Sequence, residues 1–221
     1  SDTVLLDPAL HGRLRLGLLA LEDLEVGPAG DEEIRALERT AEELRDQWQE
    51  ATDLVEIPGV AVGRELYDDL GIDMQRVPPR SEGLLDEVLR GRPIPSGDRL
   101  SAALDLCALR LRVPMAAYDA QGLTPRILAR PGARDESYAG IGRRRVAVDG
   151  RPVLCDGEGP FGSPVGDSYR TRIGEGTRRA LIVLYLPASA DPGAVESLLE
   201  GVAQTISEHC GGLAVGQAVV G

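Results

Sequence analysis

The most polar stretch of the chain is the run 167–172, in which one acid, three hydroxyl groups and two guanidinium groups follow one another. In an extended backbone, successive side chains point to opposite faces. One face would carry Asp167, Tyr169 and Thr171, and the other Ser168, Arg170 and Arg172. Such a run suits either a solvated edge strand or a pocket wall that hydrogen-bonds a small polar ligand.

A second candidate acid, Asp105, lies in the middle of a predicted helix. Asp98 or Ser96 would cap the start of this helix, and Leu100, Leu104 and later apolar residues recur on one face. Asp105 falls a quarter turn away from that face. It is either a surface acid or an acid directed into a cleft between the helix and a sheet.

Three glycines, Gly157, Gly159 and Gly162, have the spacing of a dinucleotide-binding loop. Such glycines open a helix whose first N–H groups bind pyrophosphate. Here no helical period follows, and Pro160 and Pro164 interrupt the region. We therefore expect a flexible glycine-rich loop. Gly159 could still line a pocket, because glycine lets backbone amides approach a ligand closely.

The residues required by several common mechanisms are absent or badly placed. The chain has no lysine, which excludes a Walker A loop and Schiff-base chemistry. His11 and His209 form no metal-binding spacing, so we expect no metal and no cofactor. Ser168 lacks the second glycine of a nucleophile elbow. Cys210 and the adjacent His209 would point apart on a helix.

The net charge of −12 is unevenly distributed along the chain. Residues 1–97 carry 10 Arg against 22 acids, whereas residues 98–183 carry 14 Arg against 10 acids. The second group of arginines forms either an ordinary solvated surface or a weak surface for anions. We expect no binding to duplex DNA, because that requires a denser basic footprint.

The sequence indicates a cytoplasmic protein with no membrane contact. No apolar run approaches the roughly 18 residues that span a bilayer. The first residues do not resemble a signal peptide. The three cysteines are widely spaced and form no CxxC, which is typical of reduced, buried thiols.

The elements that must position the candidate residues follow from periodicity and turn signals. The first half predicts a strand over residues 13–26, a helix over 31–50, and a loop or edge strand over 57–62. It then predicts a helix over 64–70 that Gly71 ends, and a helix over 82–90 that Ser81 caps. Beyond Pro114 the pattern predicts strands at 115–119, 127–129, 146–148, 153–155 and 180–186.

Three further signals complete the predicted elements. Asp149-Gly150 predicts a two-residue hairpin between the strands at 146–148 and 153–155. Asp191-Pro192 opens a last helix. The apolar tail 213–221 suits an edge strand. From this order we expect a cleft between the helix before Pro114 and the polar run before Ile173.

Taken together, residues 98–187 resemble the B3/B4 domain of the phenylalanyl-tRNA synthetase β subunit, and more closely its free-standing bacterial relatives. The resemblance is carried by the segments 109–114, 115–119, 170–177 and 178–186, and upstream by 66–72 and 81–90. It implies an α+β fold of the B3/B4 type, with three layers: a β-sandwich flanked by helices. We expect one domain over residues 1–221, with a lead-in to residue 60, a matching core over 61–190, and a C-terminal helix and tail.

The resemblance also implies a function. In the synthetase this domain hydrolyses the ester of a wrongly attached amino acid on the tRNA 3′ end. The expected ligand is therefore an aminoacyl-tRNA 3′ end or an aminoacyl-adenosine-like molecule, and the expected activity is a trans-editing deacylase. Relatives carry Asn and Ser where this chain has Asp105 and Ala108. The synthetase carries a His where this chain has Ala116, and an acid lines the editing pocket where this chain has Tyr169.

Each candidate residue receives an expected role. Asp167 or Asp105 would orient a water, while Thr171, Ser168 and the amides near Gly159 would hold the ester carbonyl. Arg170 or Arg172 would bind a terminal phosphate. Tyr118 and Tyr169 would stack on adenine or on the amino-acid side chain. Two alternatives stay open: a non-catalytic tRNA- or small-ligand-binding module, and a tailoring enzyme that uses aminoacyl-tRNA.

Overall fold

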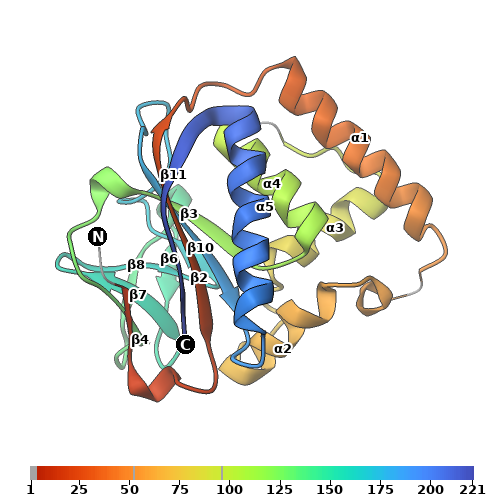
Figure 1. Cartoon of the computed structure of the whole chain (residues 1–221). Helices are drawn as coiled ribbons and strands as arrows, with labels where there is room; N and C mark the ends of the chain where they lie inside the picture. The colour runs from red at the N-terminus through yellow and green to blue at the C-terminus, as the bar shows by residue number, and fades with distance from the viewer. Residues whose placement is uncertain (1–3, 52, 96) are drawn as a thin grey trace.

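Two β-sheets lie face to face, and helices cover the outer face of one of them (Figure 1). The computed structural model describes residues 4–51, 53–95 and 97–221. The four-stranded sheet has the order β11-β2-β10-β3 and the five-stranded sheet the order β1-β4-β7-β8-β9. The fold is α+β, with helices and strands mixed along the chain.

The four-stranded sheet is antiparallel throughout. Its strands are β2 (Arg15–Leu24), β3 (Met115–Asp119), β10 (Ala180–Leu186) and β11 (Gly211–Val220). The five-stranded sheet contains β1 (Val4–Leu6), β4 (Ile127–Pro131), β7 (Pro152–Asp156), β8 (Gly159–Ser163) and β9 (Gly166–Asp167). A separate pair is formed by β5 (Ser137–Ala139) and β6 (Arg145–Ala147).

The helices are α1 (Asp31–Trp48), α2 (Val60–Leu70), α3 (Arg80–Leu89), α4 (Arg99–Leu111) and α5 (Pro192–Cys210). Short 3-10 turns lie at η1 (Pro8–Leu10), η2 (Leu54–Glu56), η3 (Ala120–Gly122) and η4 (Ile141–Arg143). Helices α4 and α5 cover the four-stranded sheet, and α1 and α3 pack on α4 (Figure 1). Leu37 of α1, Val88 of α3 and Leu106 of α4 belong to that outer core.

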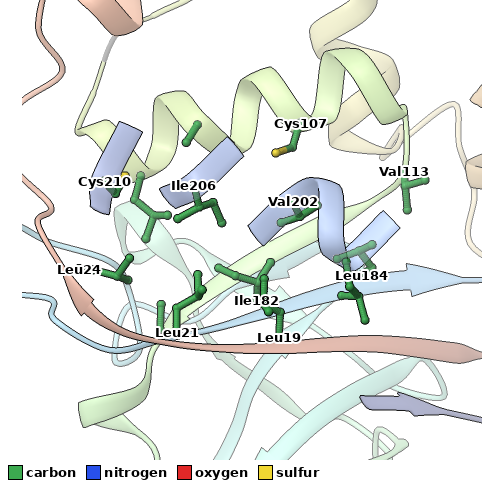
Figure 2. Close-up of a cluster of buried hydrophobic side chains, with 14 of the residues drawn as sticks. Leu19, Leu21, Leu24, Cys107, Val113, Ile182, Leu184, Val202, Ile206 and Cys210 are labelled. Carbon is green, nitrogen blue, oxygen red and sulfur yellow. The ribbon is translucent and has the colours of Figure 1, made fainter. Parts of the chain in front are cut away.

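Strand β10 is apolar along its whole length because both of its faces are buried. Ile182 and Leu184 point to α4 and α5, where they meet Val202 and Ile206 (Figure 2). Val183 and Tyr185 point the other way, into the core between the two sheets. The alternation follows from the period of two in a strand, and it explains a sequence run that reads as continuously hydrophobic.

Several predicted elements are confirmed. Asp98 caps α4, its carboxylate accepting the Ser101 N–H at 2.8 Å, whereas Ser96 lies outside the described residues. Gly71 ends α2 in the left-handed conformation. The tail forms the edge strand β11, and the three cysteines are free and buried.

Three local predictions are wrong. The strands at 146–148 and 153–155 do not form a hairpin: β6 pairs with β5, and β7 pairs with β4 and β8, so Asp149-Gly150 joins different sheets. Residues 60–62 belong to α2 instead of a loop or edge strand. Ser81 lies inside α3, whose N-cap is Pro79.

No helix in the described part of the chain is long and apolar enough to span a membrane. The boundaries of a single domain over residues 1–221 stay a prediction.

Candidate functional site

A cavity of about 720 Å³ opens where four segments meet. Its walls come from residues 76–80, from the start of β3, from the loop 140–147, and from the turn between β8 and β9. Two other cavities, of about 500 and about 340 Å³, are smaller. A volume of this size lies within the range of roughly 300–1,000 Å³ that is usual for small-ligand sites.

Asp167 supplies the carboxylate of this cavity. It ends β9, and its Oδ1 accepts a hydrogen bond from the Tyr118 hydroxyl at 2.8 Å. Burial raises the pKa of Asp167 from 3.8 to about 6, against the opposing effects of the Tyr118 hydrogen bond and the Arg80 charge. A group with a pKa near 6 is ionised at neutral pH and can still accept and release a proton.

Two tyrosines continue the hydrogen bonding from Asp167 into the core. The hydroxyls of Tyr118 and Tyr185 lie 2.8 Å apart. Because Tyr118 donates its proton to ionised Asp167, Tyr185 donates to Tyr118. Tyr185 also lines the cavity, so this chain of hydroxyls connects the ligand space with Asp167. Gly162 lies against the Tyr118 ring, where any Cβ would collide.

The turn that carries Asp167 is held by two further tyrosines. Tyr67 of α2 donates to the Pro164 carbonyl at 2.8 Å. The hydroxyl of Tyr138 lies 2.9 Å from Ser163 Oγ and donates to the Gly166 carbonyl. Bonds to backbone from two separate elements fix the direction in which β9 presents its acid.

Most of the charged side chains in the cavity lining are positive. Its lining includes the five arginines Arg76, Arg80, Arg144, Arg145 and Arg151, and among the described residues the only acid in it is Asp167. Arg76 is 3.4 Å from the carboxylate of Asp73, and Arg80 is 2.7 Å from that of Asp105. Arg145 bonds the neutral Ser137 hydroxyl at 2.9 Å. The surplus of guanidinium groups favours an anionic ligand.

Asp105 does not line the cavity but holds a residue that does. Its side chain is buried, and Oδ1 accepts a hydrogen bond from Arg80. Burial raises the pKa of Asp105, while Arg80 lowers it. Asp105 is therefore a buried acid instead of a surface acid, and Arg80 lies between it and the cavity, so Asp105 itself is not directed into the cavity.

The rest of the run 167–172 is not an extended pocket wall, because β9 ends at Asp167. Ser168 is buried and its Oγ accepts the Arg170 N–H at 3.1 Å. Thr171 is fully buried, and its Oγ1 has no hydrogen-bond partner among the described residues. Neither side chain reaches the cavity, so neither can hold an ester carbonyl there.

The two arginines of the run are occupied elsewhere. Arg170 binds both oxygens of Asp156, at 3.1 and 2.8 Å, and donates to the Gly122 carbonyl at 2.6 Å. Arg172 lies over the Tyr169 ring, with its guanidinium carbon 3.8 Å from the ring centroid. Arg170 therefore belongs to a structural ion pair, whereas the guanidinium group of Arg172 lies at the surface.

Two expected ligand contacts are ruled out by position. Tyr118 is fully buried, and its ring packs edge-on against Phe161 at 5.0 Å instead of stacking on a ligand. The glycine-rich segment is the β7–β8 hairpin, and Gly159, with φ of 117°, pairs with Asp156 outside the cavity lining. The segment expected to be a flexible loop is thus part of the sheet, where β8 lies between β7 and β9.

The structure therefore brings Asp167 and Tyr118 into direct contact and connects Asp105 to the cavity through Arg80. It separates these residues from Gly159, Thr171, Arg170 and Arg172. The sequence reasoning missed Tyr185 and the five arginines of the lining. Only the arginine excess of residues 98–183 pointed to part of that lining. No group of three or more His, Cys, Asp or Glu side chains in the described part of the chain could hold a metal.

No protein-family model and no curated protein matches the chain. Among solved structures, an N-terminal fragment of the phenylalanyl-tRNA synthetase β subunit from Pyrococcus horikoshii is similar to it, at 13% identity and a TM-score of 0.49. The similarity covers 99% of this chain and 50% of that one, so the chain spans about half the length of the fragment. A similarity of this size establishes neither family membership nor function.

Proposed function

We propose that the chain binds the 3′ end of an aminoacyl-tRNA in the Asp167 cavity and hydrolyses the aminoacyl ester. The observation that supports this most is one carboxylate, with a pKa of about 6, in a cavity whose lining also carries five arginines. The arginines suit the phosphate of a nucleotide ligand. The carboxylate suits a water-activating group that works near neutral pH. The sequence resemblance supplies the substrate class.

In the proposed reaction, ionised Asp167 accepts a proton from a water molecule as the water oxygen attacks the ester carbonyl carbon. The C–O bond to the ribose then breaks, and the proton passes from Asp167 to the departing ribose oxygen. The products are a free amino acid and an RNA with both terminal hydroxyls. Tyr118, which is bonded to Oδ1, acts as a positioning residue and leaves Oδ2 for the water.

Arg80 is the residue best placed to stabilise the negative charge that develops on the carbonyl oxygen. It lines the cavity, its charge acts on Asp167, and Asp105 holds its guanidinium group. A preorganised donor of this kind contributes about 10²–10³-fold to a rate. Thr171 has no role in this reaction, because it is fully buried outside the cavity lining.

The test is the release of labelled amino acid from a panel of mischarged tRNAs. Asp167→Asn preserves the size of the side chain and an acceptor for Tyr118, and it should lower the rate by about 10²-fold or more. Asp46→Asn makes the same chemical change at an exposed site on α1 and should leave the rate unchanged. Absence of release by the native chain across the whole panel would refute the hydrolase.

A second candidate function, a non-catalytic binding module, has one observation in its favour. In the part of the chain that the structure describes, Asp167 is the only acid in the cavity lining, and the expected hydroxyl partners Ser168 and Thr171 lie outside it. Calorimetry with a non-hydrolysable aminoacyl-adenosine mimic separates the two functions. Binding of the mimic, combined with no ester release from any charged tRNA, identifies the module.

A further inference from the structure

Several arginines in and beside the cavity form no ion pair with any acid that the structure describes. We define the arginine surface as Arg143, Arg144, Arg145, Arg151 and Arg172. Of these, Arg144, Arg145 and Arg151 line the cavity. Arg143 and Arg172 both lie over the ring of Tyr169, at 5.2 and 3.8 Å from its centroid.

Backbone contacts join the Tyr169 segment to the cavity wall. The Tyr169 N–H donates to the carbonyl of Ala139, the last residue of β5, at 2.9 Å. Gly140 forms a bridge with Ser168, and Gly140 and Ile141 line the cavity. The two groups of arginines therefore belong to one continuous surface that runs from the cavity over η4 to Tyr169.

These arginines are not neutralised as their neighbours are. In the part of the chain that the structure describes, the five have no carboxylate within 4 Å, whereas the nearby Arg130 and Arg170 bind Glu136 and Asp156 at 2.7 and 2.8 Å. Where Arg145 and Arg172 form hydrogen bonds, the acceptors are neutral oxygens. Such concentrated positive charge, in a chain of net charge −12, carries a repulsive cost that a bound anion offsets.

The chemistry of the surface fits a single RNA strand. Guanidinium groups bind phosphate in a bidentate geometry. The guanidinium group over Tyr169 also offers a flat face on which an RNA base can stack. We propose that the arginine surface binds the phosphates of the single-stranded RNA that precedes the 3′ terminal residue, so that the strand enters the cavity past η4. This inference rests on the proposed function and extends it to the path of the RNA.

The test measures binding of two short RNA hairpins, one with a single-stranded 3′ end and one blunt, over a range of salt concentrations. For the native chain we expect tighter binding to the first hairpin, with a slope of log K against log salt of about −0.7 for each phosphate contacted. The triple variant Arg143→Ala, Arg144→Ala, Arg145→Ala should bind it roughly tenfold more weakly and reduce that slope by about two.

A matched control replaces Arg35, Arg39 and Arg45 of α1 by alanine. It removes the same charge from a helix that packs on α3 and α4, and it should leave the RNA affinity and the slope nearly unchanged. Equal affinity for the two hairpins, equal losses in the two triple variants, or a native chain that binds an acidic peptide but no RNA would each overturn the inference.

The design also separates this inference from the proposed function. An aminoacyl-adenosine mimic carries no phosphate, so the double variant Arg143→Ala, Arg172→Ala, whose two residues lie outside the cavity lining, should bind it as the native chain does. Arginine-dependent RNA binding without ester release would support the surface and refute the hydrolase. Ester release that does not depend on these arginines would support the hydrolase and overturn the surface.

Discussion

The two faces of the four-stranded sheet bury different kinds of side chain. The face toward α4 and α5 packs aliphatic residues and two cysteines, Cys107 and Cys210, into one hydrophobic core (Figure 2). The face toward the other sheet contains Tyr118 and Tyr185, whose hydroxyls lead to Asp167. The same alternation along β3 and β10 therefore supplies stability on one side and a polar site on the other.

The comparison shows how a sheet can carry a titrating acid without losing its core. Each of the four tyrosine hydroxyls near Asp167 has a hydrogen-bond partner. Tyr67 bonds Pro164, Tyr138 bonds Ser163, and Tyr118 bonds both Asp167 and Tyr185. Paired buried groups avoid the penalty of about 1–3 kcal/mol for an unsatisfied one. The cost that remains is the burial of the Asp167 charge.

The largest effect is expected from a cavity on the aliphatic face. Ile206→Ala removes a fully buried side chain and should lower the free energy of unfolding by about 2–5 kcal/mol, as measured by denaturant titration. Leu213→Ala, at an exposed position, should change it by less than about 0.5 kcal/mol. If the two faces are separate, Ile206→Ala leaves the ester-hydrolysis rate of the folded protein intact; a proportionate loss of rate would contradict that separation.

Asp167→Asn should have the opposite effect on stability. The folded protein retains a proton on Asp167 up to about pH 6, whereas the unfolded chain releases it near its ordinary value of 3.8. Stability therefore falls as pH rises through that window, and the deficit is complete above pH 6. The variant lacks this charge and should be more stable than the native chain by about 1–3 kcal/mol at pH 7.

Chemical denaturation at pH 4 and pH 7 checks this prediction, since the stabilisation should shrink at the lower pH. Equal effects at the two pH values would mean that Asp167 does not titrate in this window.

The smallest expected effect is a change in titration. Tyr118→Phe removes the hydrogen bond that favours the carboxylate of Asp167, so the pKa of Asp167 should rise by on the order of one unit. The measurement is NMR titration of the Asp167 carboxyl carbon. Tyr138→Phe is the matched control, because its hydroxyl bonds Ser163 and Gly166 instead. Equal shifts in the two variants would mean that the Tyr118 bond does not set the titration.

The sequence predicted most of the elements that build this sheet. The continuous apolar run of β10, the Asp98 cap of α4 and the Asp191-Pro192 start of α5 are local signals, and each is confirmed. The Asp149-Gly150 turn was recognisable, but its role was not. Two strands beside a turn pair with each other only if both belong to the same sheet. The local sequence pattern does not determine to which sheet each strand belongs.

The site was harder to predict than the fold. Asp167 stood out because of its polar neighbours, yet those neighbours turn away: Ser168 and Thr171 are buried, and Arg170 binds Asp156. The groups that do surround Asp167 come from other elements, so only tertiary structure brings them together. Tyr185 in particular looked like an ordinary core residue within an apolar strand.

The measurement that tests the central claim most directly is the single-turnover rate of ester hydrolysis against pH, with native and Asp167→Asn protein on the same charged tRNA. If Asp167 accepts the proton of the attacking water, the native rate rises with pH and levels off above a midpoint near 6. The variant should be slow at every pH, without that midpoint. A variant that hydrolyses the ester at the native rate, or that keeps the same midpoint, would contradict the account.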